Sequence, residues 1–83
     1  IMKNHKIEMH KELRDISVNV SQYAEDLDGL AGDMLSTGSR KLEDAGYELG
    51  EARDRLEQAW DIMQRAVAAL FIEINADGGP NED

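Results

Sequence analysis

Apolar residues recur at alternating steps of four and three in two long segments, and this spacing restricts the fold more than any other feature of the chain. Heptad spacing of this kind places apolar side chains on one face of an α-helix, and another helix must cover that face. The first series contains Met9, Leu13, Ile16, Val20, Tyr23, Leu27, Leu30 and Met34. The second contains Leu42, Ala45, Leu49, Ala52, Leu56, Ala59, Met63, Ala66 and Leu70. We therefore expect two long helices that meet along these two series, which together form the hairpin seam.

A short polar cluster, Ser36-Thr37-Gly38-Ser39, separates the two series. It predicts a turn in which Ser39 caps the second helix. Because the connection is short, the two helices should be antiparallel neighbours. The chain of 83 residues is thus predicted to be all-α, a single antiparallel helical hairpin that forms a four-helix bundle as a dimer. The expected bounds are 1–75 for the hairpin, about 4–35 and 40–75 for its helices, 36–39 for the turn and 76–83 for a flexible acidic tail.

Alanine alternates with larger residues in the second series, which predicts a close approach between the helices. If the chain folds back about its turn, Ala52 faces Leu27, and small residues in such alternate layers let two backbones come together. The same register places Lys6 opposite Glu73 at the open end, where a charged pair fixes register but adds little stability if exposed. Four glycines near the turn disfavour helix, so either the turn end frays or another helix packs closely against them, and we favour local flexibility. They are Gly29, Gly32, Gly46 and Gly50.

Large apolar side chains also lie beside or behind the seam in the second helix, where one neighbouring helix cannot cover them. Residues 66–72 are apolar on all sides, as in a helix that is buried on more than one side. Burying one large side chain stabilises by about 1.5–3 kcal/mol, so this surface should find a partner. The sequence leaves two occupants open, a second copy of the chain and a different protein. The expected partner or dimer interface contains Trp60, Ile62, Val67, Phe71 and Ile74.

The charge balance, 9 basic against 18 acidic residues, gives a net charge of -9. A field of that sign repels phosphate backbones and anionic membranes, so we expect neither nucleic acid nor membrane among the partners. The longest apolar run, residues 66–72, is far shorter than the roughly 20 residues that a membrane-spanning helix needs. The chain contains no cysteine, which excludes disulfides and thiolate metal ligands. We expect a cytoplasmic protein, or one secreted by a leaderless route.

The side chains that carry most enzyme chemistry are few and poorly spaced for it. A di-iron bundle needs Glu-x-x-His on facing helices, and neither His5 nor His10 follows a glutamate at that spacing. The two histidines lie five positions apart on different faces, and we interpret both as solvated. The serines have no histidine nearby in the expected hairpin, so an activated nucleophile is not indicated. We expect no enzyme, no cofactor and no metal site.

In its size, short turn, lack of cysteine and heptad layout, the chain resembles the secreted helical hairpins of bacterial type VII secretion and their toxin-partner relatives. Typical members have Trp-x-Gly in the turn, whereas Trp60 lies in the middle of a helix here. Their C-terminal signal places an aromatic residue four positions before an acid, whereas Phe71 is followed by Asn75. The chain also resembles the hairpin co-chaperones that hold type III needle subunits. Both resemblances concern the architecture, and they imply protein binding without assigning a role to any residue.

The function expected from the sequence is protein–protein interaction through the apolar surface of the second helix, as an adaptor, chaperone or secretion partner. The alternative is an acidic regulatory inhibitor, a DNA mimic or antitoxin-like protein whose carboxylates occupy a basic site on another protein. The net charge of -9 permits this alternative.

Overall fold

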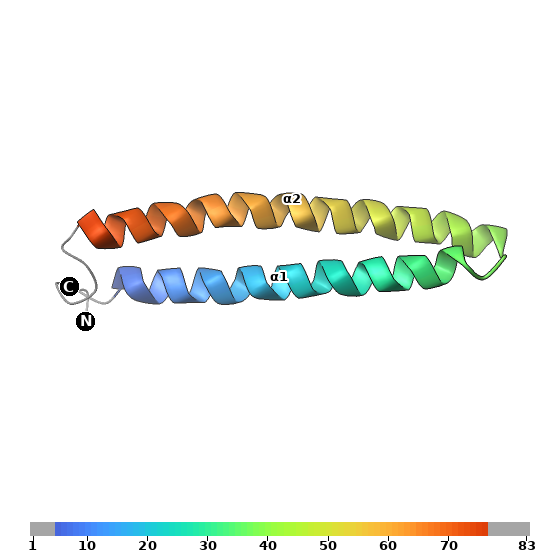
Figure 1. The fold of residues 1–83 in the computed structure, drawn as a ribbon, viewed down its shortest axis with the longest axis horizontal. Coiled ribbons are helices and arrows are strands. Elements are labelled where there is room, and N and C mark those ends of the chain that lie inside the picture. The colour runs from blue at the N-terminus through green and yellow to red at the C-terminus, as the bar shows by residue number, and fades with distance from the viewer. Residues whose placement is uncertain (1–4, 77–83) are drawn as a thin grey trace.

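The computed structural model describes residues 5–76, and two long helices account for nearly all of them. Helix α1 spans His5–Leu35 and helix α2 spans Arg40–Ala76, each within one residue of the bounds expected from the sequence. The helices lie side by side, with the turn at one end and the start of α1 beside the end of α2 at the other (Figure 1). No strand occurs in the described part of the chain, so the predicted all-α helical hairpin is confirmed. Of the expected tail, residue 76 ends α2 and residues 77–83 lie outside the described part.

Local hydrogen bonds build the turn. The Ser39 hydroxyl accepts a hydrogen bond from the Leu42 N–H at 3.4 Å, so the predicted N-cap of α2 is confirmed. The Thr37 hydroxyl donates to the Met34 carbonyl at 3.0 Å and accepts from the Ser39 N–H at 3.1 Å. Gly38 adopts a φ of 80°, a left-handed conformation that glycine reaches without strain. The sequence of the turn therefore dictates its conformation.

Contacts between the helices fix their register along the whole hairpin. Three pairs that meet across it are Lys6 with Glu73, His10 with Phe71, and Asp28 with Arg53. The Lys6 Nζ lies 3.5 Å from the Glu73 Oε1, which confirms the charged pair expected at the open end. The rings of the second pair have centroids 6.2 Å apart. Because His10 is half-buried in this contact, its interpretation as a solvated residue is wrong, whereas His5 is exposed.

Only every second residue of each expected series lies in the seam that the structure shows. The shared positions are half-buried, and they are Leu13, Val20, Leu27 and Met34 in α1 and Leu49, Leu56, Met63 and Leu70 in α2. Between them, α1 buries Ser17, Ala24 and Ala31, each one position after a residue expected in the seam. The expected residues Ile16, Tyr23 and Leu30 are instead 45%, 61% and 48% exposed. Their assignment to the seam is therefore corrected.

Helix α2 shows the same displacement by one residue. The row that faces α1 follows the expected alanines by one position and contains Gly46, Arg53, Trp60, Val67 and Ile74. Ala66 is exposed, so its assignment to the seam is corrected, whereas Ala52 and Ala59 are half-buried at the edge of the seam. The row that the structure uses recurs every seven residues like the expected one, but it is mixed, since it includes Ser17 in α1 and Arg53 in α2. The structure uses the seam that places small residues of α1 between the helices.

The two backbones approach most closely where these small residues meet Gly46. A Cβ atom added to Gly46 would lie 3.0 Å from the Ala31 carbonyl oxygen and 3.1 Å from the Leu35 Cγ, so no side chain fits there. Farther along α1, the buried Ser17 hydroxyl donates to the Arg14 carbonyl at 2.9 Å, which satisfies its hydrogen-bonding need within the helix. Gly46 is therefore a packing residue, and its interpretation as a source of flexibility is wrong.

The hairpin is long and thin and encloses little core. It measures 59 × 17 × 13 Å with a radius of gyration of 18.3 Å, whereas a compact domain of this length has a radius of about 12 Å. Among the described residues, the buried apolar side chains are only Ala24, Ala31 and Ile74. The chain exposes 6145 Å², compared with about 5,000 Å² for a compact monomer of this mass. Much apolar surface is therefore left uncovered by the hairpin itself.

Gly46→Leu should destabilise the hairpin, because the new side chain would overlap the Ala31 carbonyl and Leu35. Overpacking of this kind costs about 1–3 kcal/mol, which exceeds the gain of about 0.5–1 kcal/mol from removing a mid-helix glycine. Gly32→Leu is the matched control, since a Cβ at Gly32 meets nothing within 4 Å. Thermal unfolding followed by circular dichroism should give a lower Tm for Gly46→Leu and an equal or higher Tm for Gly32→Leu. Two variants that melt alike would contradict the close approach.

Candidate functional site

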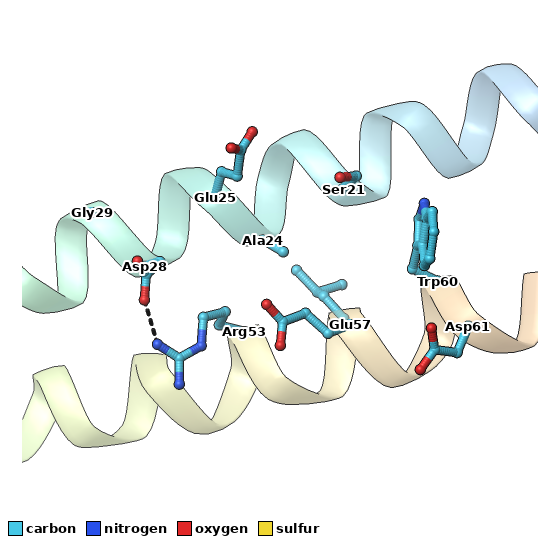
Figure 2. Close-up of a pocket in the computed structure, with 10 residues that line it drawn as sticks. Ser21, Ala24, Glu25, Asp28, Gly29, Arg53, Glu57, Trp60 and Asp61 are labelled. Atoms are coloured by element: carbon cyan, nitrogen blue, oxygen red, sulfur yellow. Dashed lines mark hydrogen bonds and ion pairs between the residues drawn. The ribbon is translucent and has the colours of Figure 1, made fainter.

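A groove runs along one face of the hairpin from its middle toward the turn. Two adjoining hollows of about 720 and 520 Å³ form it, and Asp28 and Arg53 line both. Figure 2 shows the larger hollow, which side chains from both helices surround. The residues that line this acidic groove include Ser21, Ala24, Glu25, Asp28, Gly29 and Gly32 of α1 and Gly50, Glu51, Arg53, Asp54, Leu56, Glu57, Trp60 and Asp61 of α2.

Helical geometry places the two walls of the acidic groove on the same side of the seam. Asp28 lies four positions after the buried Ala24, and Glu57 lies four positions after the seam residue Arg53. In an antiparallel pair, positions that follow the seam by four residues meet on one face, and positions that precede it by one meet on the other. The groove therefore lies on the opposite side of the hairpin from Tyr23, which precedes Ala24.

Three glycines open the groove. A Cβ added to Gly29 or Gly32 would meet no atom within 4 Å, and one added to Gly50 would meet only the Arg53 Nη2 at 3.8 Å. Each lies inside a helix, where glycine costs about 0.5–1 kcal/mol relative to alanine. No neighbour within the hairpin requires their small size. Gly29 lowers the surface in the larger hollow, and Gly32 and Gly50 lower it in the smaller one, while the Asp28–Arg53 pair spans the hairpin where the two hollows meet.

Trp60 forms the apolar end of the acidic groove near the middle of the molecule. Its ring extends from α2 toward α1, at the level of Ser21 (Figure 2), and the residue is 37% exposed. Leu56 and Ala24 line the same hollow. A partly exposed aromatic ring beside an apolar floor can bury an apolar side chain of a ligand, while the polar rim stays in water.

Carboxylates dominate the charge of the acidic groove. Six acidic residues line it, namely Glu25, Asp28, Glu51, Asp54, Glu57 and Asp61, and Arg53 is the single basic residue among the lining residues. The Arg53 guanidinium donates to Asp54 at 2.9 Å and to Asp28 across the hairpin (Figure 2). The hydrogen bonds to Asp54 and Asp28 raise the pKa of Arg53 above its ordinary value, so it remains charged while carboxylates surround it. A clear excess of negative charge is left over.

The five residues expected to form a partner or dimer interface do not share one surface. Ile74 is buried between the helices, so the prediction is corrected for this residue, whereas Val67 is half-buried. The ring of Phe71 contacts α1 at the open end, although the residue remains largely exposed. Ile62 is exposed and lines neither hollow. Trp60 alone belongs to the acidic groove.

The acidic groove could not be recognised from the sequence because its members form no motif. Carboxylates beside a seam resemble an ordinary solvated face, and the glycines near the turn resemble a flexible segment. The usable signal is that Gly29, Gly32 and Gly50 fall on the same side as the acids once the helices are aligned. That alignment requires the seam used by the structure, which differs from the expected seam by one position in alternate layers.

Within residues 5–76, no group of three or more histidine or acidic side chains is placed to hold a metal ion. Neither of the two helices is apolar enough over its length to cross a membrane, as judged on the same residues. Comparisons with protein-family models, with curated proteins and with solved structures find no match to the chain. The interpretation of the acidic groove therefore rests on its own shape and charge.

Trp60, the only tryptophan of the chain, should report the negative potential of the acidic groove. Relative to a Glu57→Gln/Asp61→Asn variant, the wild type should be quenched more by Cs⁺ and less by I⁻, because the carboxylates attract cations and repel anions. Stern–Volmer experiments at constant ionic strength measure the two quenching constants, and their Cs⁺-to-I⁻ ratio is the quantity compared between the proteins. The difference should fade between 0.1 M and 1 M salt, as the Debye length falls from about 10 Å to about 3 Å.

The control for this measurement is Glu12→Gln/Asp26→Asn, which removes the same charge from positions that line neither hollow. It should leave the quenching ratio close to that of the wild type. Equal ratios for all three proteins would show that the groove has no distinct potential.

Proposed function

We propose that the chain is a protein-binding module whose acidic groove holds a basic, amphipathic helical segment of another protein. The observation that supports this most directly is the arrangement of Trp60 and three glycine positions without close neighbours between two carboxylate-bearing walls. Adaptors, chaperones and secretion partners all hold segments of other proteins, and the proposal covers this class of function.

The shape of the groove suits a helix better than a compact ligand. An amphipathic helix binds by placing apolar residues, spaced three and four positions apart, into a hydrophobic groove. Here the walls are two long antiparallel helices, so the groove is linear. Because Gly29, Gly32 and Gly50 carry no side chains, a third helix can approach the backbones closely between the Trp60 ring and the turn.

The charge of the groove selects a basic segment. Among the described residues, Glu25, Glu57 and Asp61 make no ion pair within the hairpin, although all three surround the hollow beside Trp60. Carboxylates in this position attract lysine and arginine side chains, speed encounter and disfavour acidic partners. Apolar burial beside Trp60 would then supply most of the affinity, and the rim would supply the selectivity.

An acidic inhibitor is the second candidate function. The observation that favours it is the ratio of six carboxylates to one arginine along the groove, which makes charge the dominant feature of this face. In that case the face would occupy a nucleic-acid-binding or other basic site on its target. The two functions differ in whether binding survives when charge is screened.

A synthetic helical peptide with leucines along one face and lysines elsewhere should bind the wild type and shift the Trp60 emission to shorter wavelength. Gly29→Leu should weaken this binding at least tenfold, because the new side chain fills part of the larger hollow while the residue has no neighbour to disturb. Gln58→Leu, an exposed residue that lines neither hollow, is the matched control and should bind as the wild type does. Fluorescence titration measures all three.

Two further peptides separate the contribution of charge to binding from the contribution of the leucine face. A glutamate version with the same leucine face should not bind, and a lysine peptide with scrambled leucines should bind only weakly. Retention of the amphipathic basic peptide at 1 M salt supports the groove-binding module, since apolar burial is not screened. Equal binding of the scrambled peptide, lost at high salt, favours the acidic inhibitor. Binding that Gly29→Leu leaves unchanged would contradict the acidic groove as the site.

A further inference from the structure

The face opposite the acidic groove is apolar along most of the hairpin. The residues on this face recur every seven positions. Each lies one position before a residue of the small row of α1, such as Ala24, or before a residue of the α2 row that contains Gly46 and Trp60. We call this the apolar face, and its residues are Met9, Ile16, Tyr23 and Leu30 of α1 and Ala45, Ala52, Ala59 and Ala66 of α2. The four α1 side chains are among the large apolar residues that the hairpin leaves exposed.

The apolar face consists of two parallel rows of residues, and the side chains of the two rows differ in size. All members of the α1 row are large, and all members of the α2 row are alanine. The contact of Asp28 with Arg53 sets the register, and it places Tyr23 level with Ala59 and Ile16 level with Ala66. The face is therefore raised along α1 and hollow along α2 over several helical turns.

The exposed area of the chain matches what a second copy would cover. The chain exposes 6145 Å², which is roughly 1,100 Å² more than a compact monomer of its mass. A stable interface of standard size removes about 800 Å² from each partner. Pairing two copies through the apolar face would cover Met9, Ile16, Tyr23 and Leu30, which are 38–61% exposed, and it would surround Ala24, Ala31 and Ile74 with a core that one hairpin does not build.

We infer that two copies of the chain pair through the apolar face, related by a two-fold axis that runs along the hairpin, with both turns at the same end. This axis lays the large row of α1 in each copy onto the alanine row of α2 in the other. Large side chains then enter the spaces above alanines, and all neighbouring helices of the four-helix bundle are antiparallel.

Size complementarity decides between the two possible axes. A two-fold axis across the hairpin would place α1 on α1 and α2 on α2. Tyr23 and its row would then meet a second row of large residues, while alanines met alanines. One half of the interface would be overfilled and the other half would contain voids, and both cost stability. The axis along the hairpin avoids both costs.

Pairing through the apolar face leaves the acidic groove of each copy exposed, since the groove lies on the other side of the seam. The dimer would therefore carry two acidic grooves on opposite outer surfaces. The inference does not depend on what the groove binds.

Light scattering coupled to size exclusion tests the pairing. The wild type should have twice the 9.3 kDa mass of one chain at micromolar concentration. Tyr23→Glu and Ala59→Leu should each have the mass of one chain while remaining helical by circular dichroism, because one removes a large residue and the other fills its receiving space. Ala68→Leu, an exposed alanine of α2 outside the apolar face, is the matched control and should stay dimeric. A wild type with the mass of one chain overturns the inference, as do dimeric Tyr23→Glu and Ala59→Leu proteins.

The direction of the axis has its own test. The chain has no cysteine, so a spin label attached through Asp44→Cys, at an exposed residue near the turn, gives one label per copy. Pulsed electron resonance on the dimer should give a label-to-label distance well below about 40 Å, because both labels lie at the same end. Turns at opposite ends would separate the labels by about 40 Å or more, since residue 44 lies about 20 Å from the centre of α2 at about 1.5 Å per residue, and that distance would overturn the proposed axis.

Discussion

The close approach of α1 and α2 along a row of small residues is the contact on which the other features of this molecule depend. Ser17, Ala24 and Ala31 are the buried residues of α1, and Gly46 of α2 lies so near the Ala31 carbonyl that no side chain fits between them. Because small residues occupy the seam, the larger residues of α1 that precede them are turned outward. The choice of seam therefore determines which side chains lie on each of the two faces of the hairpin.

The two faces differ in chemistry, and each difference follows from heptad position. Residues that precede the small row by one position form the apolar face, with large side chains on α1 and alanines on α2. Residues that follow the seam by four positions, such as Asp28 and Glu57, lie on the other side, in the acidic groove that carries carboxylates, glycines and Trp60. A protein of this length cannot build a large core from two helices alone. Covering the apolar face with a second copy would supply that core and leave the acidic groove accessible.

The fold could be predicted from the sequence because its signals are local and repeated. The heptad series, the Ser39 cap and the shortness of the turn each predict the same hairpin, and the Lys6–Glu73 pair follows from folding the chain about that turn. The seam could be predicted only in part. The Tyr23 row is apolar throughout, whereas the Ala24 row includes Ser17, so apolar periodicity favours the Tyr23 row and does not reveal that its large residues are turned outward. The acidic groove depends on that same choice, which is why the sequence alone does not distinguish its glycines from a flexible segment.

Thermal unfolding of Ala24→Leu, compared with the wild type at several protein concentrations, tests the choice of seam most directly. Alanine and leucine have similar helix propensities, so the comparison reports packing. Because Ala24 is buried between the helices, the account predicts a lower Tm at every concentration, with a loss of about 1–3 kcal/mol from overpacking. An Ala24→Leu protein that melts at or above the wild type would show that the Tyr23 row, and not the Ala24 row, faces α2.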